Sequence, residues 1–348
     1  MATHNPSDQV LHSKAADEGR GRRYAAAQME VAAFCRESRV LIVAGKGGVG
    51  KTTISAALAR TASDAGLSVL LVELEGRAGI GSAFGRPHAF DYEESELSPP
   101  PDPIRGRRLT PDDALLEYLA DHGLHRVSKR IVSSGVLDVV ATAIPGIRDV
   151  LILGKVKQLE RAAAADLIVV DAPATGHAIT FLTSARGLIE AARGGPVRNQ
   201  AVEVDEMLRD PARCRVLLVC LAEELPVSET VEAARLLQEK AGTQLGPVVV
   251  NDLDEADPAL AVSAAEAADR AGVTLDPPQL EALDEARVFR LHRHELATQQ
   301  VERLARELPL PQLHVPHLDA ETIGPGELQV LADALARGIG SLTVESSR

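Results

Sequence analysis

Aromatic residues are scarce in this chain. Its 348 residues include five phenylalanines, three tyrosines and no tryptophan. Proteins that bind single-stranded nucleic acid stack the bases on aromatic side chains, and most nucleic-acid-binding surfaces are basic. The formal net charge of this chain is −13, opposite in sign to that of a basic binding surface. We therefore expect no nucleic acid partner, and we interpret the acidic balance mainly as a source of solubility.

Cysteine is also rare. The three cysteines are Cys35, Cys214 and Cys220, and no Cys-x-x-Cys pair is present. A structural zinc site in one chain commonly uses such pairs, and a secreted disulfide framework needs several matched cysteines. We therefore expect neither a thiolate zinc site nor a disulfide framework. Three scattered thiols fit a reducing cytoplasm.

Long apolar runs are missing as well. The first 23 residues, MATHNPSDQVLHSKAADEGRGRR, are polar and lack the apolar core of a signal peptide. No apolar run approaches the roughly 20 residues that cross a bilayer. We expect a cytoplasmic protein that reaches a membrane only as a peripheral component, through a partner embedded there.

Short apolar runs, in contrast, recur along the chain. Most are continuous and rich in Val, Leu and Ile, which is typical of strands buried on both faces of a parallel sheet. Helical spacing of apolar residues separates several of them. We therefore expect an α/β fold with a doubly wound, mostly parallel sheet flanked by helices. The predicted strands are residues 40–44, 68–73, 166–172, 215–222, 247–251 and 312–316.

One interval breaks the alternation of strands and helices. About ninety residues separate the second predicted strand from the third. They begin with a proline-rich loop, residues 94–108, and continue with helical patterns, the first capped by Thr110 and Asp113. We expect a helical insertion over about residues 108–165, with residues 182–212 as a candidate extension.

The remaining boundaries follow from composition. Residues 1–25 are polar and are expected to form a mobile N-terminal tail, and residues 339–348 form a short C-terminal tail. The predicted main domain, residues 38–338, lies between them and carries the motifs described next.

A glycine-rich segment follows the first predicted strand. Residues 45–52, GKGGVGKT, match the phosphate-loop pattern GxxxxGK[ST] and open a predicted helix. Glycine allows backbone N–H groups to curl around phosphate oxygens, and the helix N-terminus adds partial positive charge. The segment predicts a site for the phosphates of ATP, formed by Gly45, Gly47, Gly48, Val49, Gly50, Lys51, Thr52 and Thr53.

Three side chains of this loop have predicted roles. Lys51 is expected to reach the β- and γ-phosphates, and Thr53 to touch the α-phosphate. The Thr52 hydroxyl is expected to bind Mg²⁺. Asp171, which ends a buried predicted strand, is expected to hold the same ion through water. ATP and Mg²⁺ are therefore the expected cofactors.

An additional lysine, Lys46, and a second segment narrow the identity of the loop. KGGVGKT resembles the deviant Walker A loop of MinD and ParA, the nitrogenase iron protein, and the arsenite-pump and tail-anchored-protein targeting ATPases. Residues 169–182, VVDAPATGHAITFL, resemble switch II of the last two groups, with the proline one place earlier. The chain is identified as an ArsA-like ATPase that corresponds to a single half of the arsenite pump, over about residues 38–338.

The resemblance implies further site residues. Lys46 would cross a dimer interface to the partner's nucleotide and act there like an arginine finger. In switch II, Pro173, Gly176 and His177 would form the hinge and lever. Glu223 would lie near the partner's nucleotide, Asn251 would read adenine, and Pro316 would belong to a segment that lines the base.

Switch I departs from the family pattern. The family usually has DPAHN or DPAHS there, whereas residues 72–79 are VELEGRAG. Glu75, followed by Gly76, stands where the aspartate that positions the attacking water is expected. Glu73 stands where MinD-like relatives have a first acid, a candidate Mg²⁺ ligand. Glutamate adds a methylene to the acceptor, so hydrolysis is expected to be slower or to need a partner.

The resemblance implies a dimeric Mg-ATP-hydrolysing switch, made with a second copy or with a paralogous ATPase. It would drive efflux of an anion or metabolite through a membrane component. Two alternatives remain: a weakly active or inactive regulatory subunit, and an ATP-dependent carrier of hydrophobic segments. Three scattered cysteines and three methionines disfavour arsenite activation and tail-anchor delivery.

Overall fold

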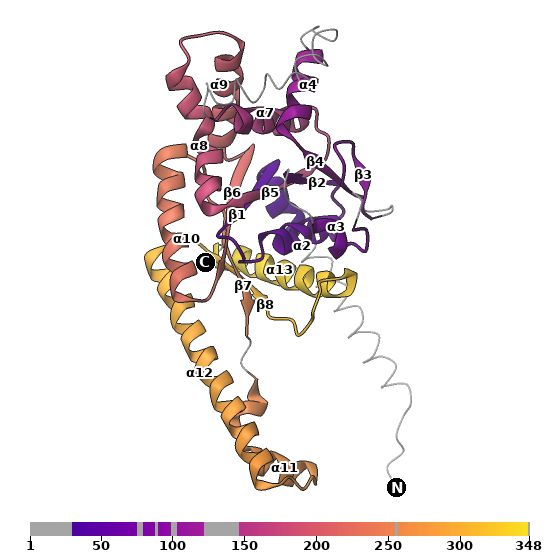
Figure 1. Cartoon of the computed structure of the whole chain (residues 1–348), viewed down its shortest axis with the longest axis vertical. Coiled ribbons are helices and arrows are strands. Elements are labelled where there is room, and N and C mark those ends of the chain that lie inside the picture. Colours follow the sequence, from indigo (N-terminus) through magenta and orange to yellow (C-terminus); the bar gives the residue numbers. More distant parts are fainter. Residues whose placement is uncertain are drawn as a thin grey trace, which may run out of the picture.

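A central eight-stranded sheet organises the computed structural model, which describes residues 30–74, 79–87, 90–98, 103–121, 146–254 and 257–346 (Figure 1). The strand order is β3-β4-β2-β5-β1-β6-β7-β8. Every neighbouring pair is parallel except β3 and β4, which are antiparallel. The strands are β1 (Val40–Gly45), β2 (Val69–Leu74), β3 (Ser95–Glu96), β4 (Ile104–Leu109), β5 (Leu167–Ala174), β6 (Cys214–Leu221), β7 (Val248–Leu253) and β8 (Gln312–Pro316).

The continuous apolar runs form strands because both faces of the sheet are covered. In β1, Val40, Ile42 and Ala44 face one buried cluster, and Leu41 and Val43 face the other. Each strand therefore needs apolar residues at successive positions, not at alternate ones. The prediction of an α/β fold with a mostly parallel, helix-flanked sheet is confirmed.

The proline-rich loop expected over residues 94–108 is only partly correct, because β4 lies within it. Half of the β4 sequence, IRGRRL, is arginine, yet all six of its residues pair with β2. The arginine side chains make this possible by finding partners. Arg105 pairs with Glu94, and Arg107 lies 4.7 Å from the centre of the Tyr92 ring. These partners could not be inferred from the pattern of β4 alone.

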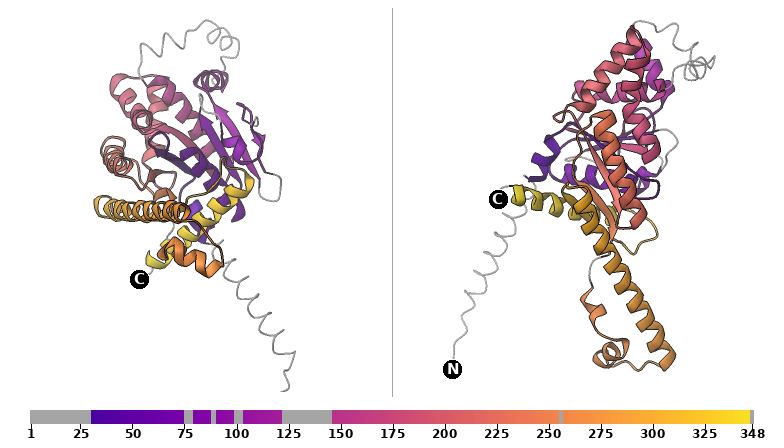
Figure 2. Two further views of the ribbon diagram at one scale, coloured as in Figure 1. Left: turned by 60° about the horizontal axis from the view of Figure 1, so that its bottom comes forward. Right: turned by 90° about the vertical axis from the view of Figure 1, so that its left-hand side faces the viewer.

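Helices cover the two faces in separate layers (Figure 2). One layer contains residues 30–36, α2, α3 and α13, and the other contains α7, α8, α9 and α10. The helices are α2 (Lys51–Asp64), α3 (Ile80–Ala83), α4 (Pro111–Asp121), α7 (Ile147–Arg161), α8 (Thr175–Ala191), α9 (Pro196–Arg209), α10 (Glu224–Leu236), which continues into the π-helical turn η1 (Leu237–Ala241), then η2 (Pro258–Ala261), α11 (Ala264–Ala271), α12 (Pro277–Glu307) and α13 (Pro325–Ser346).

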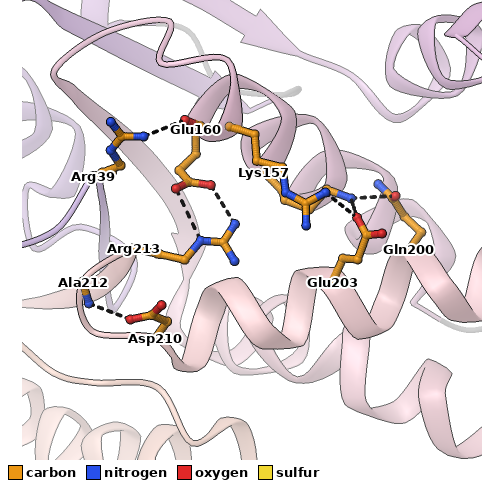
Figure 3. Close-up of polar contacts among 9 residues, drawn as sticks. Arg39, Lys157, Glu160, Gln200, Glu203, Asp210, Ala212 and Arg213 are labelled. Carbon is orange, nitrogen blue, oxygen red and sulfur yellow. Dashed lines mark hydrogen bonds and ion pairs between the residues drawn. The ribbon is translucent and has the colours of Figure 1, made fainter.

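α7 is buried on nearly all sides and carries its own charged residues inward. It packs against α4, α8 and α9. Lys157 is almost fully buried and donates to Glu203 at 2.6 Å and to Gln200 at 2.9 Å (Figure 3). The hydrogen bond from Lys157 lowers the pKa of Glu203. This pair therefore stabilises the fold at neutral pH, and its contribution is lost as the pH falls through that lowered pKa.

A second ion pair joins the C-terminal end of α7 to the start of β6. The carboxylate of Glu160 accepts two hydrogen bonds from the Arg213 guanidinium, the shorter of 2.7 Å (Figure 3). The backbone carbonyl of Glu160 also accepts from Arg39 at 3.4 Å. Both ion pairs thus fix the C-terminal part of α7 to other elements.

α11 and the N-terminal part of α12 extend away from the sheet (Figure 1). Their side chains are largely exposed, including Leu283, Val288 and Phe289. The C-terminal end of α12 returns to the body of the protein, where Leu304 is buried. Among the described residues, no helix combines the length and hydropathy required to span a bilayer.

The cysteines are well separated and buried. Cys214 and Cys220 lie on the same strand, β6, six residues apart, which corresponds to about 20 Å. Burial raises the pKa of Cys214 and of Cys35 to about 12, and that of Cys220 to about 11. A soft metalloid needs nearby thiolates, and β6 provides neither the proximity nor the ionisation.

The Lys157 pair predicts an asymmetry between its two partners. We expect Glu203→Ala to destabilise the protein by about 2 kcal/mol, because it leaves the buried ammonium without its carboxylate. Lys157→Met fills the same space without a charge, and we expect a loss of at most about 1 kcal/mol. Urea unfolding at pH 7 measures both. Glu266→Ala, in an exposed pair on α11, is the control with little effect. A larger loss for Lys157→Met than for Glu203→Ala would contradict the assignment.

The thiols give a second prediction. With each pKa at 11 or above, fewer than about one in a thousand thiols is ionised at pH 8, and each is buried. We expect no reaction with Ellman's reagent over several minutes in the folded protein and three equivalents in urea. Rapid release of even one equivalent from the folded protein would show that the burial is wrong.

Candidate functional site

The turn between β1 and α2 requires glycine for steric reasons. A Cβ on Gly45 would lie 2.4 Å from the carbonyl oxygen of Val219 on the adjacent strand β6. Gly50 has a φ of +86° and immediately precedes α2, and Gly48 has a φ of +88° with open space beside it. Residues other than glycine rarely adopt this left-handed backbone conformation. The segment therefore folds back tightly at the carboxyl end of β1 and leaves its backbone accessible.

A second helix begins beside the first. In register, Gly45 of β1 is opposite Ala174 of β5, and α8 starts at the next residue, Thr175. Within the described residues, no side chain caps the N-terminus of α2 or of α8. The partial positive ends of both helices therefore meet at the centre of the sheet edge. This arrangement suits a polyanion such as a chain of phosphates.

The predicted switch II residues lie at this β5–α8 junction. Pro173 is half-buried next to the last residue of β5, while Gly176 and His177 are exposed in the first turn of α8. No separate loop joins the strand to the helix. A displacement at the junction would therefore be passed directly to α8.

A buried carboxylate faces the start of α2. Asp171 has no exposed surface and accepts a hydrogen bond of 2.7 Å from the Thr52 hydroxyl. Ser55, one turn further along α2, donates to its other oxygen at 3.4 Å. A carboxylate and a hydroxyl beside a phosphate site are the hard oxygen donors that Mg²⁺ prefers. The fold thus brings Thr52 and Asp171, the two predicted Mg²⁺ ligands, into contact, and their oxygen atoms suit this ion.

The two lysines of the glycine-rich loop point in different directions. Lys51 is buried, and its Nζ donates to the backbone carbonyl of Lys46 at 2.6 Å, inside the loop. The Lys46 side chain is 39% exposed and pairs with Glu229 of α10 at 2.6 Å. Thr53, the neighbour of Thr52, lies in the first turn of α2. Sequence reasoning did not identify Glu229, because the spacing of 183 residues carries no signal.

Glu73 lies beside Asp171 on the neighbouring strand and pairs with an arginine. The two residues are in register on β2 and β5. The Glu73 Oε2 atom accepts from Arg108 Nε at 3.0 Å and from Arg108 Nη2 at 2.7 Å. Burial raises the pKa of Glu73, and Arg108 opposes that rise. Arg108 thus pairs with one carboxylate oxygen of Glu73, and the role of Glu73 as a Mg²⁺ ligand stays a prediction. Glu75 and Gly76 lie outside the described residues.

The residues predicted to contact the base lie at the ends of β7 and β8. A bulge in β7 turns Asn251, whose Nδ2 donates to the carbonyl oxygen of Val49 at 3.0 Å. Pro316 ends β8 and is opposite Leu253 of β7. Asn251 therefore supports the glycine-rich loop from the side expected to hold the base.

Glu223 occupies a separate position at the end of β6, where it precedes α10. It is exposed and lines a cavity of about 270 Å³. The other walls of this cavity come from the ends of β6 and β7 and from α12. In the part of the chain that the structure describes, no cluster of three or more His, Cys, Asp or Glu side chains could hold a metal ion.

Comparisons with known proteins agree with this geometry. The family model described as "Anion-transporting ATPase" matches residues 38–191, which include the glycine-rich loop and Asp171. The ATPase BagA of Mycobacterium tuberculosis is 34% identical over 321 residues, which cover 86% of this chain and 93% of that protein.

More distant relatives come from fungi. The ATPase get3 of Schizosaccharomyces japonicus is 27% identical over 247 residues, or 61% of this chain and 74% of that protein. The ATPase GET3 of Mycosarcoma maydis is 26% identical over 248 residues, or 61% and 72%. These matches agree with the glycine-rich loop and with the uncapped N-termini of α2 and α8. They show that the chain is an ATPase and belongs to the ArsA family of anion-transporting ATPases.

Proposed function

We propose that the protein is a dimeric, Mg²⁺-dependent ATPase switch in which Lys46 of each subunit acts on the partner's nucleotide. The observation that supports this most strongly is the separation of the two lysines. Lys51 lies inside the loop that would cradle the phosphates, whereas Lys46 extends from its rim and is 39% exposed. A lysine at the rim of the loop could reach the phosphates bound to a second subunit.

Within one subunit, the chain supplies most of the phosphate contacts. Backbone N–H groups of residues 45–53 and the Lys51 ammonium would bind the phosphates after Lys51 leaves the Lys46 carbonyl. Thr52 and Asp171 would hold Mg²⁺, which when bound neutralises charge on the phosphate oxygens. Asn251 and Pro316 would contact the base, and Glu223 would approach the partner's nucleotide.

Hydrolysis requires a positioned water molecule and a group that detects the γ-phosphate. We assign the water to Glu75 in switch I. We assign the detection of the γ-phosphate to the first turn of α8, with Gly176 and His177. When the γ-phosphate leaves, these contacts end, which is a recognised way to release a switch segment.

The helical layer is the proposed receiver of this motion. α8 follows β5 without a loop and packs against α7 and α9, so these three helices would move together. We propose that a membrane component for an anion or metabolite responds, which is supported by the family description. A membrane component captured in Mg-ATP but not in Mg-ADP would support this, and capture of soluble proteins alone would count against it.

The lysine assignments predict the outcome of two substitutions. We expect Lys51→Ala and Lys46→Ala each to reduce steady-state Mg-ATP turnover by at least about 100-fold, because each removes a cation that stabilises the transferring phosphate. Lys240→Ala, an exposed lysine on η1, is the control that keeps full turnover. Full activity of Lys46→Ala would remove Lys46 from catalysis. A wild type that binds ATP without turnover would identify a paralogous ATPase as the required partner.

A mixing experiment tests whether Lys46 acts across the interface. Lys46→Ala and Asp171→Asn subunits are each expected to be inactive as homodimers. In a mixed dimer, the Lys46→Ala subunit keeps its own Asp171 and receives Lys46 from its partner. An equimolar mixture should therefore recover about a quarter of wild-type turnover, since half of the dimers are mixed and each has one complete site. A mixture that stays inactive would contradict action in trans.

A further inference from the structure

The ion pair between Lys46 and Glu229 joins the glycine-rich loop to α10. The Lys46 Nζ and Glu229 Oε1 atoms are 2.6 Å apart, and the side chains are 39% and 32% exposed. The same loop is held from inside, because Lys51 donates to the Lys46 carbonyl. Lys46 is therefore fixed in its own subunit at both its backbone and its side chain.

The pair is incompletely satisfied on the Glu229 side. Within the described part of the chain, the second carboxylate oxygen of Glu229, Oε2, is buried and has no hydrogen-bond partner. A buried oxygen without a partner weakens an ion pair compared with a fully bonded one. The contact holds the Lys46 ammonium, but a phosphate group could compete with the Glu229 carboxylate for it.

α10 also connects this contact to α12. Ser228, the neighbour of Glu229, accepts a hydrogen bond of 3.0 Å from Arg303 of α12, and Arg303 pairs with Glu307. A change at Glu229 thus has a physical route to the long helix that extends from the body of the protein.

We propose that Glu229 is a positioning residue that holds Lys46 in its own subunit until the phosphates of a partner's nucleotide compete for it. This inference rests on the proposed function, in which Lys46 crosses the dimer interface. Glu229 opposes assembly and does not touch the reacting atoms. Its removal makes ATP-dependent dimerisation easier and leaves the chemistry within the assembled dimer unchanged.

The test compares wild type with Glu229→Gln, which keeps the shape of the side chain and removes its charge. ATP turnover per subunit is measured against protein concentration at saturating Mg-ATP. Two such pairs are released for each dimer that forms, so we expect the midpoint of Glu229→Gln at a concentration about two- to thirtyfold lower, from the range for partly exposed ion pairs. The plateau turnover should match wild type. Glu232→Gln, an exposed glutamate on the same helix, is the matched control with no shift.

A second measurement shows that the effect acts through Lys46. In sedimentation velocity with Mg-ATP, Lys46→Ala and Lys46→Ala/Glu229→Gln should behave alike at every concentration, because no lysine remains to be held. A wild type whose turnover per subunit does not depend on concentration, and which sediments as a monomer, overturns both the dimer and this role. A concentration-dependent wild type with an unshifted Glu229→Gln midpoint, or a shift that persists without Lys46, overturns the role of Glu229 alone.

Discussion

The hydrogen bond between Thr52 and Asp171 is the contact on which the rest of the site depends. It joins the first turn of α2 to the end of β5 at 2.7 Å, next to the register position where Gly45 meets Ala174. Because β1 and β5 are neighbours in a parallel sheet, their following helices begin side by side. The two uncapped helix N-termini and the buried carboxylate are thereby held in one small region, where phosphate and a hard cation can bind together.

The parts of the molecule around this region differ in how firmly they are fixed. α7 is anchored by buried charges, with Lys157 and Glu160 both paired to other elements. The glycine-rich loop is held by the bond from Asn251 to Val49 and by the Lys46–Glu229 pair, in which both side chains are partly exposed. In the proposed switch, we therefore expect a nucleotide to rearrange the loop and the β5–α8 junction, with α7 moving together with its neighbours.

Local sequence patterns predicted the features that depend on neighbours in the chain. The six continuous apolar runs became strands, and the glycine-rich loop with Asp171 was recognisable from residue type and spacing. β4 was missed because its stability comes from distant partners, such as Glu94 for Arg105 and Glu73 for Arg108. Glu229 was missed for the same reason, since it meets Lys46 only in the folded chain. The contact between Glu73 and Arg108 also depends on β4, so the sequence alone could not show it, and the role of Glu73 as a Mg²⁺ ligand stays a prediction.

The central claim is that Asp171 and Thr52 hold the Mg²⁺ of a bound nucleotide. Equilibrium binding of a fluorescent ATP analogue, with Mg²⁺ and with EDTA, tests it most directly. We predict that wild type binds more tightly with Mg²⁺, and that Asp171→Asn retains the affinity seen in EDTA but gains little from the ion. Equal enhancement by Mg²⁺ in both proteins, or no binding by wild type, would contradict the account.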